Sequence, residues 1–200
     1  HSEPERAQAI LNNTFYETMQ VSMNGTGHFL VQGNTFNCVS GNVQMTSPVA
    51  LDILSCDSGG VVAGNNFTGH WTRGIEVFTS NAANRPILIK NNMLACGGMN
   101  VTHQVEGVFV FNSDNINIYN NSVAVFDTVV AASDVPFRMM GSDHVRLKNN
   151  IFCNYAAGPA TSFPNMTPNF VSDHNDLFAA SGVAVNLTGL QTFSLQGWQF

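Results

Sequence analysis

The chain is poor in charge and nearly lacks lysine. Only 10% of its 200 residues are charged, compared with about a quarter in an average soluble domain, and Lys90 and Lys148 are its only lysines. Nucleic-acid binding depends on clustered Lys and Arg, so a net charge of −6 without a basic run argues against a nucleic-acid partner. No apolar run reaches the roughly 18 residues of a spanning helix, and we expect no membrane span.

The chain also lacks the usual cysteine and histidine motifs. Its cysteines, at positions 38, 56, 96 and 153, form no Cys-x-x-Cys pair, which leaves zinc and redox motifs unsupported. No two histidines have metal-ligand spacing, and we expect His28, His70, His103 and His144 at the surface. Cys38 and Cys96 lie two repeats apart, a separation of roughly 9.6 Å in a stack of coils, which is too long for a disulfide. We therefore expect buried free thiols.

Asparagine, in contrast, is the commonest residue, with 25 copies. Many of them belong to a repeat that reads Asn-Asn-x-Phe or a close variant. The second Asn of each copy falls at positions 13, 34, 65, 92, 121, 150 and 175, at a mean interval of 27 residues. We expect the apolar residue three before this Asn, and the large residue two after it, to point inward. The corner between them suits Gly-Asn and Asn-Asn pairs, because Gly and Asn tolerate left-handed backbone angles, and stacked Asn amides can hydrogen-bond along the axis.

A second strand precedes each motif. Segments 50–54, 74–78, 107–111 and 136–140 alternate between inward apolar and outward positions, as β-strands do. Two strands and a variable third arm in every 27 residues predict an all-β fold, a right-handed parallel β-helix of about seven coils over residues 9–178. Residues 179–200 would form a C-terminal cap or a partial coil of the same single domain, 1–200. A leucine-rich repeat would need several Leu in each unit, whereas the chain has 11 in total, and a β-sandwich would not explain the recurring Asn.

With these Asn-Asn-x-Phe repeats, the chain resembles the right-handed parallel β-helix, or pectin-lyase-like, superfamily. The resemblance covers roughly residues 9–178 and implies a secreted, extracellular protein. Members include polysaccharide lyases, glycoside hydrolases, epimerases, adhesins and non-enzymatic scaffolds, so the fold does not settle the function. The chain has neither the paired-Asp segment of polygalacturonases, with its Gly-His-Gly and Arg-x-Lys partners, nor the Asp-Pro-His-Asp of mannuronan epimerases. These absences lower the expectation of catalysis.

The coils would align the outward residues of the upstream strand in a column, roughly 4.8 Å apart. This column runs through Ser22, Asp52, Glu76, Phe109 and Arg138. Asp52, Glu76 and Arg138 are the candidate catalytic residues, since neighbouring carboxylates can divide acid and base roles and Arg can neutralise a uronate. Phe109 would stack on a sugar ring, and Asp52 with Glu76 offers a possible Ca²⁺ site. The alternative is a solvated strand face without function.

The outward residues of the strand that precedes the Asn corner form a second column. It runs through Gln32, Ala63, Lys90, Tyr119 and Lys148. Lys90, Tyr119 and Lys148 are candidate substrate-binding residues, and the alternative is that they only keep the surface soluble. Sequons for N-glycosylation, which requires a secretory route, occur at Asn12, Asn24, Asn66, Asn100, Asn120, Asn165 and Asn186.

Two functions remain open. The first is an extracellular domain that binds, and as a lyase or hydrolase would cleave, a polysaccharide or other glycan. The second is a non-catalytic structural or adhesive segment of a cell-surface, fibre or filament assembly. Both ends of the solenoid look blunt, and solenoids need capped ends, so we expect a segment of a longer protein whose ends are sealed by flanking coils or neighbouring subunits.

Overall fold

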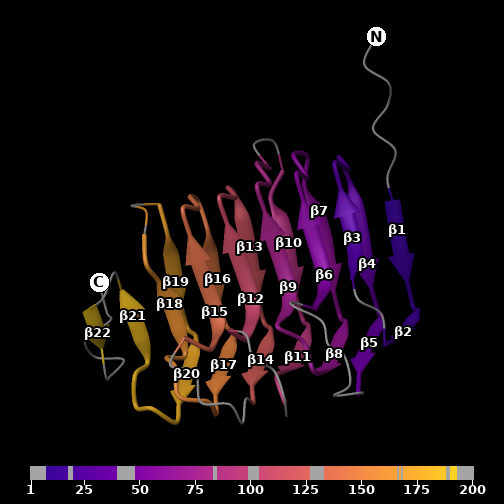
Figure 1. The fold of residues 1–200 in the computed structure, drawn as a ribbon. Coiled ribbons are helices and arrows are strands. Elements are labelled where there is room, and N and C mark those ends of the chain that lie inside the picture. The colour runs from indigo at the N-terminus through magenta and orange to yellow at the C-terminus, as the bar shows by residue number, and fades with distance from the viewer. Residues whose placement is uncertain are drawn as a thin grey trace.

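The computed structural model describes residues 8–17, 20–39, 48–82, 85–98, 104–126, 133–165, 167, 169–187 and 190–192. These residues form strands and no helix, so no helix among them is long and apolar enough to cross a membrane. The strands stack into three sheets whose colours follow one another along a single axis (Figure 1). The predicted parallel β-solenoid is therefore confirmed.

Each coil contributes one strand to each sheet. The first sheet consists of β1 (Gln8–Leu11), β4 (Phe29–Gln32), β7 (Gly60–Ala63), β10 (Ile87–Lys90), β13 (Ile116–Tyr119), β16 (Arg146–Lys148) and β19 (Val171–Asp173). The second consists of β2 (Thr14–Tyr16), β5 (Thr35–Cys38), β8 (Asn66–Gly69), β11 (Met93–Cys96), β14 (Ser122–Val125), β17 (Ile151–Asn154) and β20 (Asp176–Ala179). The third consists of β3 (Val21–Asn24), β6 (Val49–Leu54), β9 (Arg73–Phe78), β12 (Glu106–Phe111), β15 (Val135–Met140), β18 (Thr161–Phe163), β21 (Val185–Leu187) and β22 (Leu190–Thr192).

The described residues thus pass seven times through the first and second sheets, in agreement with the predicted number of coils. The structure differs from the expectation of two strands and an arm, because the residues after the Asn corner form a regular sheet of their own. Every pair of neighbouring strands is parallel except β21 and β22, which are antiparallel. Strand β22 therefore turns back along the third sheet instead of continuing the stack.

The Asn corner has the geometry that the repeat predicts. Its first residue adopts a positive φ in all seven copies, from Asn12 (54°) and Gly33 (67°) to His174 (51°). The second residue is an Asn whose side chain turns inward and bonds to the next coil. Asn92 is typical: its Oδ1 accepts from the backbone N–H and the Nδ2 of Asn65, both at 3.0 Å, while its Nδ2 donates to Val62 O. The ladder continues to Asn175 without a break.

A second ladder, which the repeat did not reveal, lies at the corner between the third and first sheets. There a residue with positive φ, such as Thr79 (47°) or Asn112 (44°), precedes a buried small polar side chain. The backbone N–H of each coil donates to the side chain of the next: Cys56 N to Ser80 Oγ, Ser80 N to Ser113 Oγ, and Ser113 N to Ser142 Oγ, each 3.0 Å. Serine hydroxyls at this corner accept hydrogen bonds from the backbone of the neighbouring coil, as side-chain amides do at the Asn corner.

The core lies between the three sheets and is almost wholly apolar. Phe15, Phe36 and Phe67 stack along the second sheet with centroid distances of 4.9 and 4.5 Å. Trp71 is fully buried, so it belongs to the core and does not wall a surface groove. Its indole N–H donates to Thr68 O, which satisfies the one polar atom that its burial would otherwise leave without a partner.

The four cysteines are free, as the spacing of the repeats predicts. Cys38, Cys56 and Cys96 are buried, and Cys153 is partly exposed. Burial raises the pKa of the Cys96 thiol to about 12. Burial also raises the pKa of Cys38 to about 11, with a further contribution from the carboxylate of Glu17.

Candidate functional site

The outward column that the sequence predicts on the third sheet is present in the same register. Ser22 pairs with Asp52, Asp52 with Glu76, Glu76 with Phe109, and Phe109 with Arg138. Ser162 continues the column on β18. The upstream strands alternate cleanly between core and surface, and this alternation made the register predictable.

The central side chains of this column are largely buried, however, although Ser22 is exposed, so the alternative of a fully solvated strand face does not hold. Asp52, Glu76 and Phe109 are only 7%, 8% and 6% exposed. Arg73 provides part of the cover, because its guanidinium carbon lies 4.6 Å from the centroid of the Phe109 ring. A cation held over a ring face in this way is attracted by the ring quadrupole.

Arg73 and Glu106, which lie just before the strand segments 74–78 and 107–111 expected from the sequence, complete the cluster. They pair with each other at the start of β9 and β12, and each is followed by a glycine. A Cβ on Gly74 would lie 2.7 Å from Leu94 Cδ2, and one on Gly107 would lie 2.2 Å from Val123 Cγ1. Because only glycine fits against the core at these points, the residue before it faces outward beside the column.

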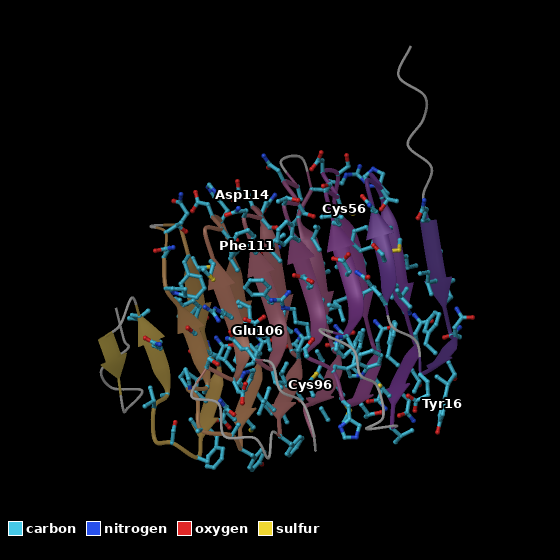
Figure 2. All side chains as sticks on the ribbon, viewed as in Figure 1. Tyr16, Cys56, Cys96, Glu106, Phe111 and Asp114 are labelled. Atoms are coloured by element: carbon cyan, nitrogen blue, oxygen red, sulfur yellow. The ribbon has the colours of Figure 1, made fainter. Side chains whose placement is uncertain are left out.

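An ion network joins Arg73 and Glu106 to this column. Arg73 Nε donates to Glu106 Oε2 at 2.6 Å, and Arg73 Nη1 donates to Glu76 Oε1 at 2.8 Å. Arg138 Nη1 lies 3.3 Å from Glu106 Oε1. Glu106 is 1% exposed, and these two guanidinium groups provide ion-pair partners for its buried carboxylate, which would be strongly unfavourable without them. Figure 2 shows Glu106 and Phe111 on the same broad face of the solenoid.

Burial raises the pKa of the Asp52 carboxyl above its usual range. Hydrogen bonds from Ser22 Oγ (3.2 Å) and Gln20 Nε2 (2.8 Å), both to Asp52 Oδ2, and the charge of Arg73 act in the opposite direction without cancelling the effect of burial. The donors are neutral and lie on the side of the column away from Glu76.

Burial also raises the pKa of the Glu76 carboxyl. Arg73 lowers this pKa, while the negative charges of Asp52 and Glu106 raise it. Two neighbouring carboxyl groups therefore hold protons more tightly than free side chains do, which is a property of general acids. Arg73 already supplies a cation to Glu76, so the pair is less suited to Ca²⁺ than the sequence suggested. No group of three or more His, Cys, Asp or Glu able to hold a metal ion occurs in the described part of the chain.

An apolar strip runs beside the charged column on the same face. It consists of the next outward residues of the central strands, Leu54, Phe78, Phe111 and Met140, which are partly exposed and paired in register. The rings of Phe78 and Phe111 stack with their centroids 4.9 Å apart. The surface thus offers ring faces and methyl groups next to guanidinium and carboxyl groups.

The other predicted binding residues lie elsewhere. Lys90, Tyr119 and Lys148 form the predicted column with Gln32 and Ala63, but this column belongs to the first sheet. The structure therefore does not bring them together with Asp52, Glu76 and Arg138. Lys148 lies 3.4 Å from the carboxylate of Asp173, and both side chains are about half exposed.

The sequons and histidines have mixed environments. The Asn side chains at positions 12, 24, 66, 120 and 165 are exposed, Asn186 is partly buried, and Asn100 lies outside the described residues, as does His103. His144 is exposed, but His28 and His70 are partly buried, so they do not fit the expected surface position. N-glycosylation remains a prediction for the exposed sequons.

No protein-family model matches the chain, and no curated protein and no solved structure matches it either. The assignment of function therefore rests on the geometry of the solenoid faces.

Proposed function

We propose that the chain is an extracellular glycan-binding β-solenoid of the pectin-lyase-like kind, which holds a polysaccharide along the outer face of the third sheet. One observation carries the proposal: the charged column and the apolar strip lie side by side on the same strands. Binding sites for small molecules and sugars combine apolar and aromatic surface with a few polar groups of fixed orientation. Here Phe78 and Phe111 supply the rings, and the ion network fixes the guanidinium groups of Arg73 and Arg138.

The accessible groups also suggest how the glycan would be held. Arg73 and Arg138 keep 33% and 23% of their side chains exposed, whereas the carboxylates that orient them are buried. A sugar would therefore contact guanidinium N–H groups and ring faces, and Glu106 would act as a positioning residue beneath them. Guanidinium groups favour sugars that carry a carboxylate, because they bind it in a bidentate manner.

Binding to a panel of neutral and uronate-containing polysaccharides, measured by calorimetry, tests the proposal. Phe111→Ala should weaken binding about tenfold, which corresponds to roughly 1.4 kcal/mol and lies within the range for one aromatic contact. Tyr119→Ala on the first sheet is the matched control and should leave the affinity unchanged. Absence of binding across the panel, or equal losses in the two variants, would contradict the proposal.

Cleavage is a second candidate, favoured by the two neighbouring carboxyl groups of raised pKa. Asp52 and Glu76 would then serve as an acid and base pair, with Arg138 at the next but one position of the column. Incubation of the protein with each polysaccharide should release reducing or unsaturated sugar, and Glu76→Gln should abolish the release. If no product forms with any glycan that binds, catalysis is excluded for that substrate and binding alone remains.

A structural or adhesive role is the alternative to both. The observation that favours it is the burial of Asp52, Glu76 and Glu106, whose carboxyl groups have hydrogen-bond or ion-pair partners within the protein. In that case the network would stiffen the central coils, and Glu76→Gln would lower thermal stability without affecting any ligand. Stability and affinity measured on the same variant distinguish this role from glycan binding.

A further inference from the structure

The outer face of the second sheet carries large apolar side chains that remain largely exposed in the part of the chain that the structure describes. Met93, Phe126, Ile151, Tyr155 and Phe178 are between 44% and 64% exposed. The ring of Tyr155 lies 5.0 Å from that of Phe126 and 5.4 Å from that of Phe178, measured between centroids. This face belongs to a different sheet from the charged column, so it is independent of the glycan proposal.

These side chains border a shallow apolar hollow. Its floor includes Ala95, Ala124 and Cys153, which lie in register on β11, β14 and β17. Met93 and Ile151 rise on one side of the floor, and Ser122 between them leaves a gap. From Met93 through Ser122 to Ile151, large and small side chains therefore alternate from one coil to the next.

The same face is free of charge over its central strands. From β5 to β17 its outward residues are Thr35, Asn37, Asn66, Thr68, Met93, Ala95, Ser122, Ala124, Ile151 and Cys153. The first charged residue is Asp176 on β20. Two molecules with a net charge of −6 repel each other, and an uncharged face lets them meet without bringing like charges into contact.

We propose that the outer face of the second sheet is the interface with a second copy of this chain. The exposed parts of the five large side chains amount to about 500 Å², most of the roughly 800 Å² per partner in a standard interface. The small residues between them and the polar rim supply the remainder. In a dimer with two-fold symmetry, both copies use this same face. A large side chain of each copy then fills the gap at Ser122 of the other copy.

Sedimentation equilibrium of the full chain across the micromolar range is the primary test, and we expect a dimer. Ile151→Lys should raise the dimer dissociation constant at least about tenfold, because it replaces an apolar side chain by a charged group that the interface must desolvate, even with Asp176 beside it. Val171→Lys is the matched control, since Val171 is equally exposed (49%) but lies on the first sheet. Both variants change a surface residue, and circular dichroism should record the same fold in each.

The alkylation rate of Cys153 provides a second readout. This thiol lies on the proposed interface and is the only partly exposed one of the four. Its alkylation should slow about fivefold or more as the wild-type concentration rises, and this protection should be lost in Ile151→Lys. A wild-type monomer at high micromolar concentration, or a dimer that Ile151→Lys leaves intact, would overturn the proposal. Co-sedimentation of a monomer with phosphatidylcholine vesicles would overturn it in favour of a membrane surface.

Discussion

Replacement of Asn92 by Ala should destabilise the solenoid more than any conservative surface change. Asn92 is 1% exposed and occupies the middle of the Asn ladder. Its Oδ1 accepts from the backbone N–H and the Nδ2 of Asn65, and its Nδ2 donates to Val62 O and to Asn121 Oδ1 at 2.9 Å. Alanine removes all four hydrogen bonds and leaves partner groups in the interior without water to replace the lost amide.

The size of the effect follows from the groups left behind. The N–H of Asn65 loses its acceptor and Val62 O loses its side-chain donor. Each buried polar group without a partner costs about 1–3 kcal/mol, so Asn92→Ala should lower the free energy of unfolding by about 3–5 kcal/mol. Asn91→Ala next to it removes an exposed side chain at a positive φ of 54° and should cost only about 1–2 kcal/mol of left-handed strain.

Urea denaturation followed by circular dichroism measures both variants against the wild type. The end of the ladder supplies a further control, because Asn13 is exposed and its own Nδ2–Oδ1 bond to Asn34 is long, at 3.4 Å. Asn13→Ala should therefore cost about 1 kcal/mol, as for one ordinary hydrogen bond. If Asn92→Ala proves no more destabilising than Asn91→Ala or Asn13→Ala, the ladder does not stabilise the stack and the reasoning fails.

Three further predictions concern the titrating and thiol groups. Burial raises the folded-state pKa of Asp52, so the wild type loses stability as pH rises from about 4 through that pKa, and Asp52→Asn should become more stable than the wild type over this range. A hydrogen bond from Asn169 lowers the pKa of Asp143, so Asp143→Asn should be less stable than the wild type over the same range. Denaturation at several pH values checks both variants. Cys96 and Cys38, with pKa values of about 12 and 11, should resist alkylation at pH 8 in the folded protein, while Cys153 reacts first, as mass spectrometry of labelled peptides would record. Cys56→Ser should leave the midpoint of thermal unfolding unchanged or raise it, because serine occupies the equivalent position at Ser80, Ser113 and Ser142; a clear drop would contradict the role assigned to the second ladder.

The Asn corner could be predicted because one residue type has to meet two demands there. The backbone needs a left-handed residue at the first position, and the neighbouring coil needs both a donor and an acceptor at the second. Asn at the second position meets the latter demand in every coil, so the motif repeats visibly in the sequence. The second corner could not be predicted, because Thr26, Cys56 and Ser80 all occupy its ladder position. Three different residue types at one position do not form a recognisable repeat.

The column on the third sheet was predictable in register but not in environment. Strict alternation around Leu51 and Ile53 fixes which side chains face outward, but it does not reveal how deeply they lie. The missed signal was the recurrence of Arg73-Gly74-x-Glu76 and Glu106-Gly107-x-Phe109, which places a charged residue and a glycine at the start of two adjacent strands. Contacts such as Arg73 to Glu106 join residues 33 positions apart, and their distance becomes known only once the coils are stacked.

The ends of this column bear on the question of function. At Ser22 and Ser162 the same outward position is filled by a small neutral residue, so the solenoid does not need charge there. Buried ion pairs are often no more stabilising than neutral residues of similar size. The central coils nevertheless hold Asp52, Glu76 and Arg138, and beside them Arg73 and Glu106. Because the fold accepts serine at this position, the stability of the stack does not require the charges of the central coils, and this supports the glycan-binding proposal over the purely structural one.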